Sequence, residues 1–299
     1  MSGRRPQLKL ATAPEEVTED RWQDWGTNGL PHLPGRRLAA RGTHTPTAAA
    51  RLDTLSGALQ DHLDVWPAGD AVQRFVTDAD TVDERRDRQA VVGTLEVLSS
   101  LPISPISWPP VGGASGGPRL LTALELGLLR LRARRRSARA LVIAQLEAGA
   151  APAEFPTLTS DRFVVTDDGR IGIDLVGYGT TLPRRGWLPA WSLPLAAEHL
   201  HRTAPGGHPL YDGANPTPAR LRSCVHRIAV TALVAAGFGT EPDVTPLSVR
   251  HTVARAIHDA HGLDPAAAFL GCRTPTTVHS ILQLDRVLAD QDRPLPLAS

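Results

Sequence analysis

A short run of residues near the C-terminus has the side chains that phosphate chemistry uses. The run Thr245–Thr252 reads TPLSVRHT and places Arg250 directly beside His251. An arginine guanidinium can hold a phosphate group through two parallel hydrogen bonds. The same guanidinium could instead pair with a buried carboxylate such as that of Glu154, and the sequence leaves both interpretations open.

Nucleophilic side chains are scarce in this part of the chain. The sequence contains two tyrosines, Tyr178 and Tyr211, and one lysine, Lys9. These counts exclude any reaction that needs a tyrosine near the C-terminus or a lysine after residue 9. Ser280 could act as a nucleophile only if a base activated it, and His279 beside it is the candidate base. The simpler expectation for His279 is a solvated position on a helix.

The sequence does not predict a metal site. His258 and His261 are three residues apart on one helix face, so both could bind a metal, and Cys272 follows nearby. No further ligand pattern accompanies them, and we expect histidines that are exposed or cap a helix. Cys224 and Cys272 form neither a CxxC pair nor a disulfide framework. No cofactor of any kind is predicted.

Arginine supplies nearly all of the positive charge, and it is concentrated in two places. A run of ten residues contains six arginines: Arg130, Arg132, Arg134, Arg135, Arg136 and Arg139. A second group, with helical spacing, comprises Arg220, Arg222 and Arg227. Residues 1–118 carry 12 Lys and Arg against 15 Asp and Glu, a net charge of −3, whereas residues 119–299 carry 20 against 16, a net charge of +4. We therefore expect a nucleic-acid ligand to bind the second half, although either group could be an ordinary solvated surface.

The elements that must position these residues are mainly helical. Apolar residues at three- and four-residue steps predict helices over 48–65, 71–76, 83–101 and 121–148. The turn Asp167-Asp168-Gly169 between two alternating segments predicts a β-hairpin over 163–175, and a further strand is expected over 187–191. Later helices are expected at 195–202, 217–236, 247–261, 264–270 and 275–290.

Residues 102–118 divide the chain, because their prolines and glycines sustain neither helix nor strand. The glycines here lack the following lysine of a phosphate-binding loop. We expect a poorly structured segment at 1–47 with one short helix around Glu15–Trp25, a helical domain at 48–101, the linker at 102–118 and an α+β domain at 119–299. The predicted fold class is mainly α with a small antiparallel β-sheet. No apolar run approaches eighteen residues and the N-terminus lacks a signal-peptide core, which predicts a cytoplasmic protein without membrane contact.

Two boxes in the C-terminal part resemble those of the tyrosine recombinases, the phage-integrase family. TPLSVRHT is similar to the family phrase T-P-H-x-L-R-H-T, and LGCRTPTT, Leu270–Thr277, is similar to its second box, L-G-H-x…T-T. Cys272 stands 22 positions after Arg250, about where the family has its second histidine. About 70–299 can be aligned with the family, with strong matching confined to 245–277. The resemblance implies a helical core-binding-like domain followed by a tyrosine-recombinase-like catalytic domain.

The reaction of that family needs residues that this chain mostly lacks. In the family a tyrosine attacks a DNA phosphodiester, two arginines and a histidine stabilise the charge that builds up on the phosphate, and a lysine protonates the leaving oxygen. Arg250 is the one catalytic position retained. The resemblance places Ala151 at the first arginine, Leu247 at the first histidine, Cys272 at the second histidine and Ser280 near the tyrosine.

The sequence therefore predicts a catalytically inactive DNA-binding protein that acts as a regulator or accessory factor in DNA recombination or integration. Its expected partners are double-stranded DNA and a catalytically active recombinase or another protein subunit. The residues expected to contact DNA are Arg130, Arg132, Arg134, Arg135, Arg136, Arg139, Arg220, Arg222, Arg250 and His251.

Three other functions remain open. The chain could be an active integrase whose nucleophile is atypical or supplied in trans by a partner. It could be a helix-turn-helix transcriptional regulator built from Asp264–Leu282, with Gly271 at the turn. A hairpin packed beside the Arg250 helix would reject that second alternative. The third is a protein-interaction scaffold that has lost DNA binding as well.

Overall fold

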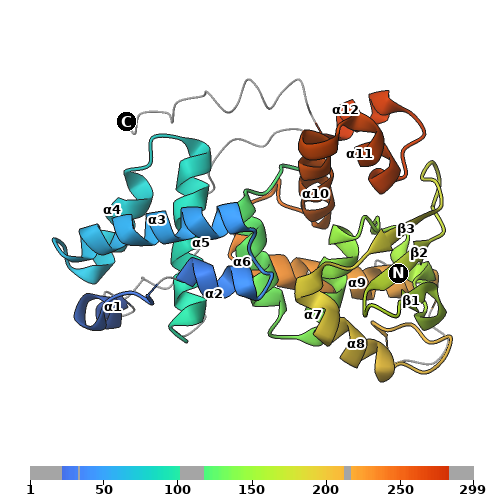
Figure 1. Cartoon of the computed structure of the whole chain (residues 1–299), viewed down its shortest axis with the longest axis horizontal. Coiled ribbons are helices and arrows are strands. Elements are labelled where there is room, and N and C mark those ends of the chain that lie inside the picture. Colours follow the sequence, from blue (N-terminus) through green and yellow to red (C-terminus); the bar gives the residue numbers. More distant parts are fainter. Residues whose placement is uncertain (1–21, 33, 102–117, 212–216, 283–299) are drawn as a thin grey trace, which may run out of the picture.

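The computed structural model describes residues 22–32, 34–101, 118–211 and 217–282. This part of the chain is mainly α-helical and has one small antiparallel sheet, as the sequence predicts (Figure 1). The predicted linker over 102–117 and the continuation of the last helix to residue 290 lie outside the described residues.

Five helices form the N-terminal part: α1 (Gln23–Asn28), α2 (Pro34–Ala40), α3 (Pro46–Leu63), α4 (Ala68–Thr77) and α5 (Val82–Leu98). The two long ones begin at threonines. The Thr45 hydroxyl accepts a hydrogen bond from the Ala48 N–H at 3.2 Å, and the Thr81 hydroxyl accepts one from the Glu84 N–H at 3.1 Å. Such caps satisfy backbone N–H groups that have no partner inside the first turn of a helix.

The segment before residue 47 contains more structure than its composition predicts. Helices α1 and α2 lie within it, and the side chains of Trp25 and Leu38 are buried. The Trp25 indole N–H donates to the Ser99 hydroxyl at 2.9 Å, which ties α1 to the end of α5. The expectation of a poorly structured segment is therefore wrong for the described residues between 22 and 47, because buried aromatic and leucine side chains hold two short helices in place.

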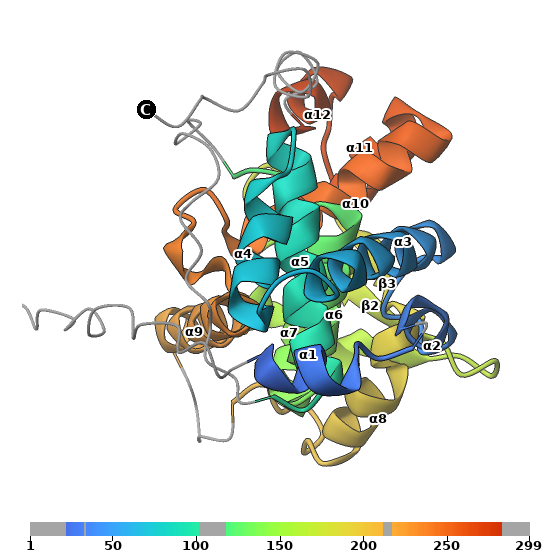
Figure 2. The ribbon, with the colours of Figure 1, turned by 90° about the vertical axis from the view of Figure 1, so that its left-hand side faces the viewer.

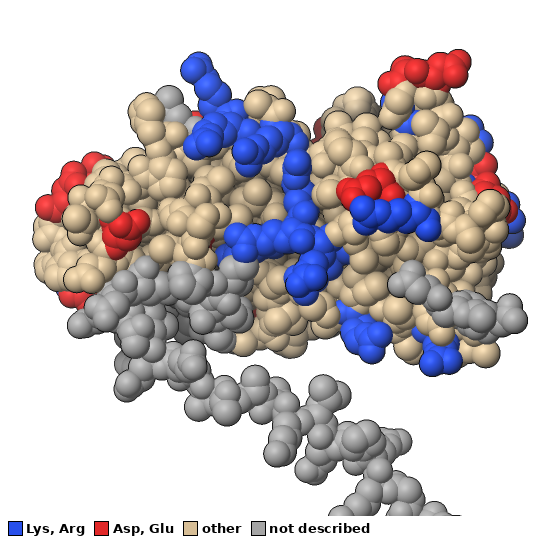
Figure 3. Space-filling model, turned by 90° about the horizontal axis from the view of Figure 1, so that it is seen from below, with Lys and Arg blue, Asp and Glu red and all other residues tan. Residues whose placement is uncertain are grey.

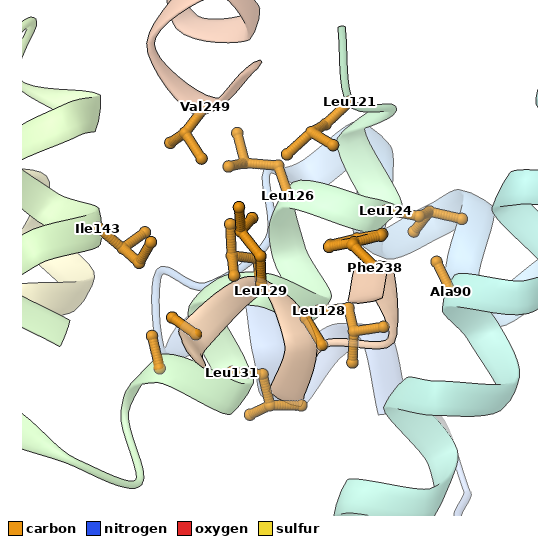
Figure 4. Packing of buried hydrophobic residues seen from close by; sticks show 14 of the residues in the cluster. Ala90, Leu121, Leu124, Leu126, Leu128, Leu129, Leu131, Ile143, Phe238 and Val249 are labelled. Carbon is orange, nitrogen blue, oxygen red and sulfur yellow. The ribbon is translucent and has the colours of Figure 1, made fainter. Parts of the chain in front are cut away.

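The predicted helical and α+β domains share one hydrophobic core. Helix α5 packs against α6 (Ala123–Ala133), and Ala90 of α5 lies in the same cluster as Leu124 and Leu128 of α6 (Figure 4). Gly93 permits this close approach, because a Cβ atom at that position would lie 2.9 Å from Leu128 Cδ2. Burial of apolar surface between the two parts favours one fixed arrangement over independent domain movement.

The C-terminal part places helices around the small sheet. Its long predicted segment, 121–148, forms two helices, α6 and α7 (Ser137–Glu147), joined by a tight turn. The remaining helices are α8 (Leu193–His201), α9 (Pro218–Ala235), α10 (Pro246–His261), α11 (Leu263–Leu270) and α12 (Pro275–Leu282). Helices α10 to α12 share a second, smaller core. In both ribbon views α11 and α12 lie at the top and α8 lies at the bottom (Figures 1 and 2).

The sheet contains β1 (Phe163–Val165), β2 (Ile171–Leu175) and β3 (Arg184–Trp187), paired in that order and all antiparallel. The hairpin β1–β2 lies where the sequence predicts it, and Gly169 in its turn has a φ of 77°. The third strand was expected over 187–191 but lies at 184–187. Pro189 and a 3₁₀ turn at Ala190–Ser192 follow the strand, so the apolar residues that suggested it belong to the connection into α8.

The sequence predicts neither membrane contact nor a metal site, and the described residues bear on both expectations. None of their helices is long and apolar enough to cross a membrane. Within the same ranges, no three or more metal-binding side chains come together. His258 contacts the carboxylate of its neighbour Asp259 at 3.1 Å, and His261 is exposed.

Candidate functional site

The Arg250 side chain is buried at the N-terminal end of α10. The Thr245 N–H donates to the Ser248 hydroxyl at 3.1 Å, and Pro246 occupies the first turn, so the helix start is well defined. The Arg250 side chain is 4% exposed. Its Nε donates to the Gly149 carbonyl at 2.9 Å and its Nη2 donates to the Leu270 carbonyl at 2.5 Å. Arg250 therefore joins the end of α7 to the end of α11.

A second arginine, Arg184 of β3, enters the same pocket. Its Nη1 and Nη2 donate to the Glu154 carboxylate at 2.9 and 2.8 Å, a bidentate pair. Its Nη2 also donates to the Gly149 carbonyl, and its Nε donates to the Phe269 carbonyl at 2.9 Å. The Glu154 side chain is fully buried and accepts a further hydrogen bond from the Ala151 N–H at 2.7 Å. The two guanidinium groups thus meet at one carbonyl oxygen, that of Gly149.

Burial dominates the electrostatics of this pocket. It lowers the pKa of Arg250 to about 10, and the positive charge of Arg184 adds to that effect while Glu154 and Cys272 oppose it. Burial also lowers the pKa of His251 to about 4, assisted by the charge of Arg250. The pKa of the Cys272 thiol is raised by burial, which outweighs the attraction of Arg250 and Arg184 for a thiolate. At neutral pH His251 and the Cys272 thiol are therefore uncharged, and Cys272 lies near both Arg250 and Arg184.

Neither interpretation that the sequence left open for Arg250 describes its contacts. The donor groups for which hydrogen bonds are resolved face backbone carbonyls, and Glu154 pairs with Arg184 instead. A phosphate contact by Arg250 or by His251, which is 7% exposed, would require the surrounding pocket to open. The sequence patterns do not single out Arg184 as a member of this cluster, although the alternation of a strand carries the information. Arg184 and Gly186 face inward, whereas Arg185 and Trp187 are exposed.

The positions that the resemblance makes equivalent to catalytic residues do not form a reactive set. Ala151 supplies only its backbone N–H to Glu154, and Leu247 is half-buried. Ser280 and His279 are both exposed on α12. Tyr178 lies in the connection between β2 and β3 and is 55% exposed. Among the described residues, the hydrogen bonds of Arg184 and Arg250 are directed at carbonyls and a carboxylate, so this cluster stabilises the fold.

The arginine run from 130 to 139 divides into two groups. Arg130 pairs with Glu147, the closest N–O distance being 2.7 Å, and also donates to the Thr43 carbonyl at 3.1 Å. Arg132 is 6% exposed and lies 3.5 Å from the Glu96 carboxylate. These two arginines are internal ion-pair partners, which corrects the expectation that they face a ligand. The remaining members are exposed or half-buried: Arg134, Arg135, Arg136 and Arg139.

The second predicted basic group lies on α9. Arg220, Arg222 and Arg227 are all exposed there, as their spacing predicts. Arg220 lies near the ring of Tyr211, with 6.0 Å between the guanidinium carbon and the ring centroid. Val230 and Val234 are also exposed on this helix, so its outer surface is only partly basic.

Strand β3, which pairs with the hairpin strand β2, lies near the Arg250 helix. Arg184 of β3 and Arg250 of α10 donate to the same Gly149 carbonyl, and β3 contacts α11. A helix-turn-helix protein built from α11 and α12 has no need of this arrangement. The contact is made by β3 and not by the β1–β2 hairpin, so the helix-turn-helix alternative stays open.

Comparisons with known proteins give similarity at the level of structure only. No family model matches the chain, and no curated protein matches it. Among solved structures, XerA recombinase is similar with 16% identity over 88% of this chain and 100% of that chain, at a TM-score of 0.47. XerH site-specific recombinase bound to its difH substrate, in a pre-cleavage complex, has 14% identity over 93% and 99%, at 0.43. Lambda integrase residues 75–356 bound to DNA have 15% identity over 90% and 96%, at 0.41.

Proposed function

We propose that this protein binds duplex DNA through arginines on its surface and does not cut it. The observation that carries the proposal is the closed pocket around Arg250, in which Arg184 and Glu154 complete an internal network while other arginines remain exposed. The proposed role is that of a regulator or accessory factor in DNA recombination or integration. A partner that is itself a catalytically active recombinase fits this role.

The chemistry of strand cleavage supports the inactive assignment. Cleavage by transesterification forms a bond between a nucleophilic oxygen and phosphorus and breaks the bond to the 5′ oxygen, which must then gain a proton. A serine nucleophile would need a base, and no hydrogen bond joins Ser280 to His279 among the described contacts. An arginine is a poor donor of the proton that the leaving oxygen requires, and the only lysine is Lys9.

Exposed arginines support DNA binding, which does not require a catalytic site. Phosphate contacts supply most of the non-specific affinity of a protein for DNA, and they require exposed cations with no carboxylate partner. Arg135 and Arg136 on the α6–α7 turn are exposed, as are Arg220, Arg222 and Arg227 on α9. Internal ion pairs remove Arg130 and Arg132 from this set.

The proposal is tested with the full chain and a labelled duplex in two assays. Gel shifts across a salt series measure binding, and denaturing gels after incubation with a nicked duplex detect a covalent protein–DNA adduct. We expect a complex that weakens steeply with salt, and no adduct. The Ser280→Ala variant is the matched control, since Ser280 is exposed and should bind DNA as the wild type does.

The outcomes separate the remaining functions. An adduct formed by the wild type and lost in Ser280→Ala would establish an integrase with an atypical nucleophile, and an adduct found only when an active recombinase is added would establish a nucleophile supplied in trans. Failure to shift any duplex at low salt would leave the interaction scaffold, which the acidic half of the chain favours.

A further inference from the structure

Arginines from two distant parts of the sequence meet at the boundary between the N-terminal and C-terminal parts. We call this group the seam cluster, and its members are Arg36, Arg37, Arg41, Arg134, Arg135 and Arg136. The Arg134 Nη1 donates to the Arg41 carbonyl at 3.3 Å and lies 3.5 Å from the Trp191 carbonyl, just before α8. All of them except the half-buried Arg134 are exposed. The residue types near 134 suggested a basic surface, but nothing in the sequence linked them to α2.

The fold fixes these two segments against each other. Gly35 allows the backbone of α2 to pack closely against α3. A Cβ atom at that position would lie 2.1 Å from the Ala49 carbonyl oxygen. The connection from α2 to α3 is then held from the other side, since Arg130 donates to the Thr43 carbonyl. Arg130 is itself anchored by Glu147 of α7. The buried arginines of the run therefore position the exposed ones.

The seam cluster has positive charge without local neutralisation. Among the described residues, none of its six members forms an ion pair with an aspartate or glutamate. The nearest acidic group on the adjoining helix, Asp53 of α3, accepts a hydrogen bond from the Gly35 N–H at 2.7 Å. Figure 3 looks at the molecule from the side that bears α8 and shows basic side chains gathered across the middle of that face.

This face is remote from the closed pocket. Gly149, where Arg184 and Arg250 meet, follows the C-terminal end of α7, whereas Arg136 precedes its N-terminal end. A helix of that length separates the two places by roughly 16 Å at 1.5 Å per residue. The seam cluster is therefore a different surface from the cluster around Arg184 and Arg250.

We propose that the seam cluster is the principal DNA-binding surface of this protein and grips the phosphate backbone of a duplex. The inference rests on the proposed function and names its surface. Six arginines that form no ion pair with a carboxylate of the described residues, five of them exposed, supply more positive charge here than the three arginines of α9. Contacts of this kind fix a protein on the backbone and do not read the base sequence.

Three double variants of the full chain test the surface. Arg36→Gln with Arg37→Gln and Arg135→Gln with Arg136→Gln remove charge from the two segments of the seam cluster. Arg222→Gln with Arg227→Gln removes the same charge from α9 and serves as the matched control. We expect each seam variant to weaken duplex binding about tenfold and to reduce the slope of log affinity against log salt by about two, while the α9 variant stays near the wild type. Circular dichroism confirms that all three fold.

The results distinguish the surface from the function. If the wild type binds DNA but both seam variants bind equally well, or if the α9 variant alone loses binding, the seam assignment is overturned and the proposed function stands. Loss in Arg135→Gln with Arg136→Gln but not in Arg36→Gln with Arg37→Gln would also overturn it, because α2 would then contribute nothing. If the wild type does not bind, the proposed function itself fails. Size-exclusion measurement with light scattering adds one outcome: a seam-dependent dimer without DNA affinity assigns the cluster to self-association.

Discussion

Burial changes what an arginine in this chain can do. The sequence singles out arginines by their number and spacing, and it treats them as ligands for phosphate. In the fold Arg250, Arg184, Arg130 and Arg132 are engaged with carbonyls or carboxylates, and only their neighbours reach solvent. Sequence could not separate the two groups, because neighbouring residues of a helix point in directions about 100° apart and long charged side chains are usually exposed.

Glu154 should be essential for stability. It is fully buried and neutralises Arg184, so Glu154→Gln leaves an uncompensated buried cation. We expect the free energy of unfolding to fall by about 3 kcal/mol or more, measured by urea denaturation at pH 7. The control is Asp174→Asn, which breaks the exposed pair with Arg185 and should cost less than about 1 kcal/mol. Equal losses in the two variants would contradict an internal role for Glu154.

His44 should make the fold sensitive to acid. Burial, and then the charge of Arg130, lowers its pKa from 6.5 to about 4. The unfolded chain therefore binds this proton more readily, so the contribution of neutral His44 is complete above pH 6.5 and is lost as the pH falls towards 4. We measure the free energy of unfolding by urea denaturation at pH 7.5 and at pH 5. The decrease between the two should be roughly 2 kcal/mol smaller in His44→Gln than in the wild type. The exposed His261 supplies the control, since His261→Gln should follow the wild-type curve.

At the scale of elements, periodicity predicted most helices and the β1–β2 hairpin. Helix α1 begins near the end of the short helix expected around Glu15–Trp25, and α2 was not predicted. Both are short, and the residues that hold them are buried against α4 and α3. The misplaced third strand has a similar cause. β3 reads RRGW and looks like a loop, yet its register opposite β2 sends Arg184 inward to Glu154 and buries Gly186 against Ala148. Tertiary partners, which no local pattern contains, decide such short elements.

Close packing of α5 on α6 should make one helix glycine indispensable. Alanine normally stabilises a helix relative to glycine by up to about 1 kcal/mol. At Gly57 of α3 a Cβ atom would meet nothing within 4 Å, and Gly57→Ala should show this gain. Gly93→Ala forces Leu128 aside and should be less stable than Gly57→Ala by about 1–3 kcal/mol. Chemical denaturation of both variants decides the matter, and equal stabilities would mean that the α5–α6 contact is looser than described.

At the scale of the whole molecule, charge is distributed by face rather than by half. Counting by halves gave the N-terminal part a net negative charge and assigned a nucleic-acid ligand to the other part. The fold instead separates the charges within the N-terminal part. Arg36, Arg37 and Arg41 lie at the seam, whereas exposed aspartates cluster around the ends of α3, α4 and α5: Asp61, Asp64, Asp70, Asp78, Asp80 and Asp83. Acidic side chains are visible at that end of the molecule in Figure 3.

The Glu154 carboxylate has the character of a ligand that the chain supplies to itself. A pocket that takes an anion from solution becomes more stable as the anion concentration rises. Here the anion is tethered by the backbone beside Arg184, so its effective concentration is set by the fold and not by the surroundings. Glu154 consequently occupies the two guanidinium donors of Arg184 that an anion from solution would otherwise take.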